Sequence, residues 1–174
     1  MTFRLNCCAL AGAVMLLSFH AGCRGEPVVA DPHPGADTEA VEDRPGGEWP
    51  RFRGPDGMGA TEATGLPLEW STEAGIAWKT PLPGAGASSP IVFGHHIYLT
   101  CYTGYGVPGE DGGRLEDLQR SLLCLGRDDG AVLWERTVPA RQPEESRVRD
   151  HGYAASTPVA GPDGVFVFHG KSGV

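Results

Sequence analysis

The sequence predicts an all-β fold of short antiparallel strands, and three observations carry this prediction. Short runs rich in Val, Ile, Leu, Thr and aromatic residues recur between residues 76 and 169, and several alternate apolar with polar positions. Gly and Pro are frequent, at 26 and 15 residues, and they stand between these runs, where turns are needed. Apolar residues spaced three and four apart, the pattern of an amphipathic helix, are missing after residue 23.

The first 23 residues are typical of an export signal and not of a folded element. Arg4 precedes an apolar stretch, 7–19, that is too short to cross a bilayer, which takes about 20 residues. The following His-Ala-Gly-Cys resembles the lipobox of bacterial lipoproteins, in which the Cys is acylated and becomes the mature N-terminus, although His20 replaces an aliphatic residue. We expect lipidation at Cys23, with ordinary signal cleavage nearby as the alternative.

Residues 24–48 are acidic and Pro-rich and contain almost no large apolar side chain. Such a segment cannot offset its ordering entropy, so we expect a disordered tether. Arg24 stands where an Asp would resemble an inner-membrane retention signal. Its presence favours the outer membrane if the cell has two membranes.

The net charge of −8 argues against nucleic acid as a partner, because a phosphate backbone requires a basic face.

The segment that follows the tether is turn-rich and opens the folded part of the chain. Its three aromatic residues, Trp49, Phe52 and Trp70, are expected to anchor it across the domain surface. We expect Arg51 and Arg53 to cover apolar surface and to pair with carboxylates, with a binding pair as the alternative. Strands are then expected at 76–82, 88–92, 96–101, 121–125, 131–138, 156–160 and 165–169.

The strongest hairpin signal is Asp129-Gly130, a turn dipeptide between two apolar runs, of which the second carries Trp134. A tight turn here would fix the strand register. Cys101 and Cys124 fall in neighbouring predicted strands. We interpret them as small buried apolar residues, with a disulfide as the alternative in an exported protein.

The strand-rich part of the chain repeats itself. Residues 88–100 align with 156–168 without a gap, and Trp78 aligns with Trp134, although the second copy has a longer loop after its Trp. One unit therefore contains four antiparallel strands, which is the signature of a β-propeller blade. Trp134 is then expected to fill the gap between adjacent blades, the alternative being an ordinary core Trp of a β-sandwich.

Residues 124–134 resemble the tryptophan-docking repeat of the pyrroloquinoline-quinone (PQQ) β-propellers, whose common pattern is Ala-x-Asp-x-x-Thr-Gly-x-x-x-Trp. Gly130 and Trp134 match, whereas Gly126 replaces the Asp and Asp129 replaces the Thr. The opening segment is also similar to the start of exported bacterial members of this family.

The resemblance covers residues 49–174 and implies a partial propeller of about two blades. It implies structural docking roles for Trp78, Trp134, Asp129 and Gly130. Closed propellers have about 4–8 blades, so we expect the chain to be an N-terminal fragment of a longer protein.

The resemblance indicates fold more strongly than function, because this architecture hosts enzymes and scaffolds alike. We interpret the protein as an exported, lipid-anchored, non-catalytic scaffold with protein partners in the periplasm or at the outer membrane, and we assign no catalytic, cofactor or metal residue. One alternative is a quinoprotein oxidoreductase that uses PQQ and calcium; against it, the only Asn is Asn6, in the signal. Another is a domain that binds or processes polysaccharide.

Two short motifs imitate nucleotide sites. Residues 104–109 match Gly-x-Gly-x-x-Gly, but they neither follow a βαβ strand nor open a helix, and acidic residues follow them. Residues 170–172 resemble the end of a phosphate-binding loop but lack its earlier Gly. We expect both to be ordinary loops.

Overall fold

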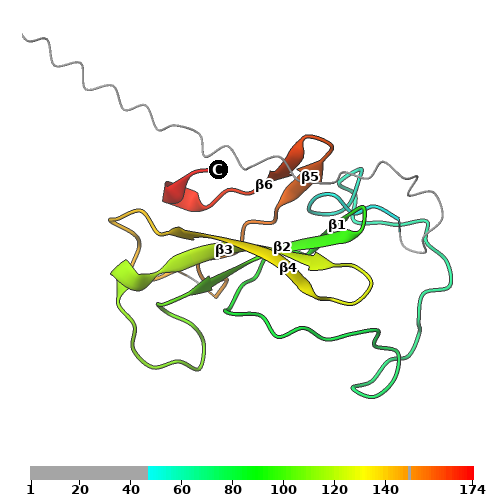
Figure 1. The fold of residues 1–174 in the computed structure, drawn as a ribbon, viewed down its shortest axis with the longest axis horizontal. Coiled ribbons are helices and arrows are strands. Elements are labelled where there is room, and N and C mark those ends of the chain that lie inside the picture. Colours follow the sequence, from blue (N-terminus) through cyan, green and yellow to red (C-terminus); the bar gives the residue numbers. More distant parts are fainter. Residues whose placement is uncertain (1–46, 149) are drawn as a thin grey trace, which may run out of the picture.

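The computed structural model describes residues 47–148 and 150–174. The predicted signal, Cys23 and nearly all of the predicted tether lie outside the described residues. The elements are six strands and two short 3-10 helices, so the all-β prediction is confirmed (Figure 1). In chain order they are β1 (Ile91–Phe93), β2 (His96–Thr103), η1 (Leu115–Asp117), β3 (Gln119–Gly126), β4 (Val132–Pro139), β5 (Val159–Gly161), β6 (Gly164–Phe166) and η2 (Gly170–Ser172).

The strands form two antiparallel sheets. The first has the order β1-β2-β3-β4, and the second is the hairpin β5-β6, which lies over one face of the first sheet (Figure 1). These sheets correspond to one complete four-stranded unit and the first two strands of the next. The described part of the chain forms no closed ring of sheets, so the propeller remains a prediction.

Each face of the first sheet is defined by alternating residues of β2, β3 and β4. On one face, which we call the hairpin face, the cross-strand partners Tyr98, Cys124 and Trp134 lie side by side. The opposite face, which we call the docking face, carries Cys101, Leu123 and Leu125, all of them buried. A sheet that buries apolar residues on both faces needs cover on both sides, and each fully buried side chain contributes roughly 1.5–3 kcal/mol.

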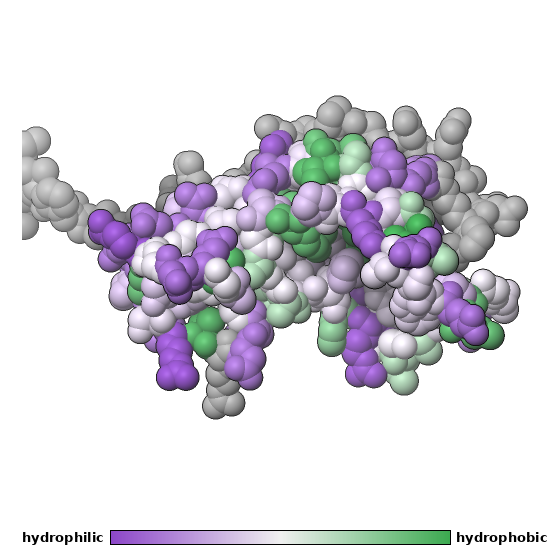
Figure 2. Space-filling view, turned by 90° about the horizontal axis from the view of Figure 1, so that it is seen from below, coloured by the Kyte–Doolittle hydropathy of each residue, from purple (hydrophilic) through white to green (hydrophobic). Residues whose placement is uncertain are grey.

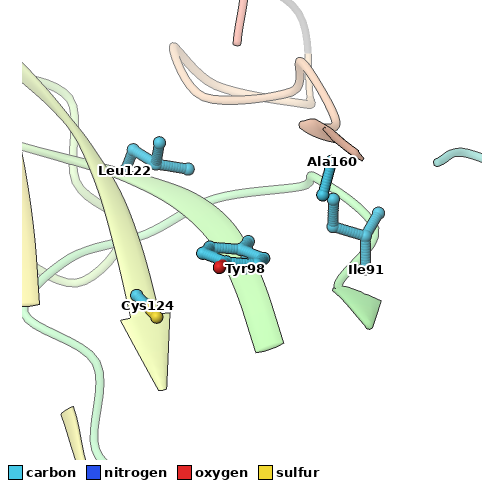
Figure 3. Packing of buried hydrophobic residues seen from close by; sticks show 5 residues of the cluster. All are labelled: Ile91, Tyr98, Leu122, Cys124 and Ala160. Atoms are coloured by element: carbon cyan, nitrogen blue, oxygen red, sulfur yellow. The ribbon is translucent and has the colours of Figure 1, made fainter. Parts of the chain in front are cut away.

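The cover of the hairpin face is the hairpin β5-β6. Ala160 of β5 packs against Ile91 and Tyr98, and Figure 3 shows Ala160 beside Ile91, with Tyr98, Leu122 and Cys124 continuing the cluster across the sheet. Val165 and Val167 pack on the same cluster from the side of β6. The two aligned repeats therefore meet through their apolar faces.

The neighbours Trp49 and Pro50 join the two sheets. Trp49 exchanges backbone hydrogen bonds with Val92 of β1, at 2.8 and 2.9 Å, and the carbonyl of Pro50 accepts the N–H of Ala160 in β5 at 2.9 Å. Gly54, at φ 81°, lies so close to the Trp49 ring that a Cβ there would meet it. Glu48 also takes part in the fold, since its carboxylate accepts the N–H of Gly94 at 2.9 Å.

Three expectations for the segment before β1 are wrong. Residues 76–82 form no strand, because no partner strand lies beside them among the described residues. Phe52 and Trp70 are 60% and 70% exposed and do not anchor the segment. Arg51 and Arg53 donate instead to backbone carbonyls of their own loop, Arg51 to Gly54 and Pro55, and Arg53 to Met58.

The connection between β3 and β4 is wider than the tight turn that Asp129-Gly130 predicts. Gly126 donates its N–H to the carbonyl of Ala131 at 2.8 Å, and Gly130 donates to the carbonyl of Gly126 at 2.9 Å. The register also shifts by a bulge between Cys124 and Leu125. The five residues 127–131 therefore form a broad loop, and this loop receives Trp78.

Candidate functional site

Trp78 lies over the β3-β4 loop, and two side-chain hydrogen bonds, one from Trp78 and one from Thr80, hold its segment there. Its indole N–H donates to the carbonyl of Arg127 at 3.1 Å. Two residues further along, the Thr80 hydroxyl donates to the carbonyl of Gly130 at 2.6 Å. The segment 76–82 is thus held by side chains that bond to a distant loop, and not by a backbone ladder.

Gly130 is required at this contact for two reasons. Its φ of 70° lies in the left-handed region, which glycine enters without steric cost. The Trp78 ring also packs directly on its backbone, so that a Cβ at residue 130 would overlap the ring and crowd the Thr80 hydroxyl. Backbone conformation and ring contact therefore select the same residue.

Asp129 shapes the loop from within. One oxygen of its carboxylate accepts the N–H of Ala131 at 2.9 Å, an arrangement that turns the chain back into β4. The same oxygen would lie 2.5 Å from a Cβ at Gly126. The two departures from the docking pattern are thereby linked, because the carboxylate of Asp129 occupies space that a side chain at residue 126 would need.

The Trp78 ring also covers the docking face of the sheet. It packs, with Ile97 and Leu99, against the buried cluster of Cys101, Leu123 and Leu125. Burial, followed by the nearby carboxylate of Glu135, raises the pKa of the Cys101 thiol to about 11. Trp78 therefore joins the loop to the sheet and keeps water from this face.

Trp134, which aligns with Trp78 in the sequence, has different surroundings. It is half-buried on the hairpin face, where its ring centroid lies 5.8 Å from that of Tyr98 at an interplanar angle of 47°. The guanidinium of Arg136 lies 5.7 Å from the Trp134 ring. Trp134 thus closes the outer end of the cluster that the hairpin β5-β6 covers.

The two cysteines are free and buried, and they lie on opposite faces of the sheet, so they do not face one another. This agrees with the interpretation as small buried apolar residues. Burial raises the pKa of Cys124 to about 11, although its hydrogen bond with Tyr98 acts in the opposite direction. Burial also raises the pKa of Tyr98, and both groups stay protonated at neutral pH.

A cluster of buried charge, which the sequence did not indicate, lies where the long loop after β4 returns to the sheet. Arg120 of β3 bonds Glu144 at 2.5 Å, and both side chains are less than a tenth exposed. Arg120 also donates to the carbonyl of Tyr153 at 2.8 Å. The loop is therefore held to the sheet by a buried ion pair, whose disruption would leave an uncompensated charge.

Two titratable groups adjoin this ion pair. Burial would raise the pKa of Glu144, but hydrogen bonds from Arg120 and a backbone N–H outweigh it, and the net shift is downward. His169 is 8% exposed, and burial together with the Arg120 charge lowers the pKa of its imidazole. These shifts arise from the burial of Glu144 and His169 near Arg120 of β3.

The nucleotide-like motifs form loops in the structure. Residues 104–109 lie between β2 and η1 with several glycines at positive φ, and residues 170–172 form η2, a single 3-10 turn. A shallow depression of about 410 Å³ is lined by Arg141, Gln142, Pro143 and Lys171. Within residues 47–148 and 150–174, no three His, Cys, Asp or Glu side chains gather as a metal site would require, and no helix has the length and apolarity of a membrane span.

Comparison of the chain with protein-family models, with curated proteins and with solved structures found no match. The site is therefore defined by this chain's own geometry. Three of the four residues expected to dock, Trp78, Asp129 and Gly130, come together at the β3-β4 loop. The fourth, Trp134, lies on the opposite face of the sheet.

Proposed function

We propose that this chain is an exported, lipid-anchored, PQQ-like β-propeller repeat protein that acts as a non-catalytic binding and assembly scaffold at the cell envelope. The observation that carries the proposal is the docking of Trp78 on the loop 127–131. Trp78 stands at the repeat position of Trp134, one unit earlier in the sequence. A Trp of one unit therefore fastens the β3-β4 loop of the next.

Such a contact supports a stack of units. The unit β1–β4 is fastened by Trp78 on its docking face and is covered by the following hairpin on its hairpin face. Repetition of this relation joins sheet to sheet through apolar faces, which is the arrangement of propeller blades. The side chains of Trp78, Thr80 and Asp129 all bond to backbone atoms of the β3-β4 loop. Such bonds favour a structural role for this contact.

The exposed apolar residues before β1 support protein partners. Leu66, Leu68 and Trp70 are 56%, 93% and 70% exposed within five successive residues. Clustered Leu and Trp side chains of this kind are buried when proteins bind one another. On the face seen in Figure 2, hydrophobic and hydrophilic side chains are mixed.

Acylation of Cys23 is the part of the proposal that labelling tests directly. The full chain, produced in a bacterium that exports and lipidates proteins, should take up radiolabelled palmitate and fractionate with membranes. Cys23→Ser should abolish both. Label that persists in the Ser variant would show that the anchor is elsewhere.

The scaffold proposal is tested against the quinoprotein alternative by titration of the purified full chain with PQQ and Ca²⁺. Calorimetry and absorbance should show no saturable binding. A PQQ-binding dehydrogenase in the same buffer is the positive control. Saturable micromolar binding that depends on Ca²⁺ would overturn the non-catalytic proposal and favour an oxidoreductase.

A further inference from the structure

The loop after β4 is the stretch by which the second repeat is longer than the first, and we call residues 140–148 of this loop the strap. The strap is fastened to the segment that precedes β3. Ala140 donates its N–H to the carbonyl of Leu118 at 2.9 Å, and the side-chain amide of Gln142 donates to the carbonyl of Leu115 at 3.1 Å. The inserted stretch is therefore a fixed part of the fold.

The strap covers an apolar cluster at this end of the sheet. The buried members of the cluster are Tyr102, Leu118, Ala140, Tyr153 and Ala154, and Val148 of the strap packs against them. The rings of Tyr102 and Tyr153 meet edge to face, with their centroids 5.5 Å apart. The Tyr153 hydroxyl also donates to the carbonyl of Glu145 in the strap at 2.8 Å. Release of the strap would therefore uncover these side chains.

A buried charge pair fastens the middle of the strap to β3. The guanidinium of Arg120 bonds the carboxylate of Glu144 at 2.5 Å, and both side chains are less than a tenth exposed. While Glu144 is ionised, the two charges cancel. A buried pair of this kind holds its partners firmly, but the loss of either charge leaves the other without compensation.

A third titratable group adjoins the pair. His169, which directly precedes η2, is 8% exposed and lies within the influence of the Arg120 charge. η2 lies above the end of β4, where the strap begins (Figure 1). From η2, the Lys171 ammonium donates to the carbonyl of Pro143 at 2.9 Å and to the exposed carboxylate of Glu145 at 3.2 Å. The strap is therefore held from two sides, by β3 and by η2.

Acid would add positive charge to this site in two steps, because His169 would gain a charge and Glu144 would lose one. The other charged and titratable groups at the site do not offset this change. Lys171 is cationic, and burial raises the pKa of Tyr153, which stays neutral in acid. Each group is already buried by described residues, so further cover would only increase the cost of an unbalanced charge beside Arg120.

We propose that Arg120, Glu144 and His169 form an acid-operated latch, which holds the strap on the sheet at neutral pH and releases it on acidification. Burial and the Arg120 charge lower the pKa of His169 from 6.5, so its contribution to stability is fully present above pH 6.5 and is lost as the pH falls below that value. The pKa of Glu144 is lowered from 4.5, so a second loss follows below pH 4.5. The first step is therefore the one that operates in mild acid.

The first test is hydrogen exchange of the full chain at about pH 7.5 and about pH 5.5, followed by mass spectrometry and corrected for the intrinsic effect of pH. Strap amides, among them the bonded N–H of Ala140, should exchange at least about tenfold faster in acid, and the amides shared by β2 and β3 should not. His169→Gln removes the titrating group and should suppress the acceleration. His151→Gln is the matched control, since His151 is exposed on the same loop, and it should behave like the wild type.

The second test imitates protonation of the carboxylate. Glu144→Gln should open the strap already at about pH 7.5, whereas Glu145→Gln, at the exposed neighbour, should not. Equal protection of the strap at both pH values, equal opening of the two His variants, or equal opening of the two Gln variants at Glu144 and Glu145 would overturn the proposal.

An NMR titration of the imidazoles in the unsubstituted chain decides the matter even if a variant fails to fold. His169 should titrate below pH 6.5, over the same interval in which the strap amides lose protection. A His169 that titrates at pH 6.5 or above would equally overturn the latch.

Discussion

The stretches 76–82 and 132–138 occupy the same position in the sequence repeat, yet they take different structures. The second is β4, paired along its length with β3. The first is not a strand and is held by Trp78 and Thr80 on the β3-β4 loop. Similar local sequence thus gives a strand where a partner strand is present and a docked segment where none lies beside it. Strand formation depends on context in this way because a strand is stabilised by its neighbours.

The two tryptophans differ accordingly. Trp78 covers the docking face and contacts backbone atoms of a loop, whereas Trp134 packs among side chains of its own sheet on the hairpin face. Only the first contact joins one repeat unit to the next by a side-chain dock. The comparison predicts that changes at the two positions loosen different parts of the molecule.

The largest expected effect is that of Gly130→Ala. The alanine must adopt a positive φ, and its Cβ must displace the Trp78 ring. We therefore expect the free energy of unfolding, measured by urea denaturation, to fall by about 3 kcal/mol. Gly94→Ala is a matched control, because Gly94 also has a positive φ, of 58°, but nothing lies within 4 Å of its Cβ position. It should lose about 1 kcal/mol.

A double-mutant cycle isolates the ring contact within that loss. In a Trp78→Ala background the clash with the ring is removed, so Gly130→Ala should cost less than in the wild type, and the remaining cost comes from the backbone strain and the contact with the Thr80 hydroxyl. Equal costs in both backgrounds would mean that the ring does not rest on Gly130. The contact between the Trp78 ring and the β3-β4 loop would then not explain why residue 130 is a glycine.

A smaller effect is expected from Trp78→Ala and Trp134→Ala, each about 2 kcal/mol, because both rings are half-buried. Hydrogen exchange should separate them. Loss of Trp78 should expose the amides of 76–82 and of the β3-β4 loop, and loss of Trp134 should expose the hairpin β5-β6. Phe at either position should retain most of the stability, since a ring still fills the site. Identical exchange patterns would contradict the comparison.

The all-β class and six of the seven strands could be predicted from the sequence, because alternation and turn residues are local signals. The strand expected at 76–82 failed because its state depends on a partner that local sequence does not encode. The broad β3-β4 loop was also missed. Asp129-Gly130 favours a tight turn, but the carboxylate of Asp129 and the contact with Trp78 select a wider one.

The repeat pointed to Trp78, and the resemblance implied roles for Asp129 and Gly130, but the contact between them could not be predicted. The repeat alignment shows that Trp78 and Trp134 are equivalent, and it does not show which loop either one meets. The buried pair of Arg120 and Glu144 gave no signal, because an Arg just before the strand expected at 121–125 and a Glu in a charged loop look like surface residues. Contacts between distant segments of the chain can be identified only once the fold is known.

The smallest effect at neutral pH is expected at the two thiols, which report separately on the two faces. The folded pKa of each is about 11, above the ordinary 9.0, so folding favours the protonated thiol. The stability that each thiol contributes is therefore fully present below pH 9 and is lost as the pH rises toward 11. The melting temperature should fall over that interval, and it should fall less in Cys101→Ala and Cys124→Ala.

At pH 8, maleimide should label both thiols slowly. Trp78→Ala should speed the labelling of Cys101, which the ring covers, and leave the labelling of Cys124 unchanged. Equal acceleration at both thiols would mean that Trp78 holds the whole sheet together and not one face of it.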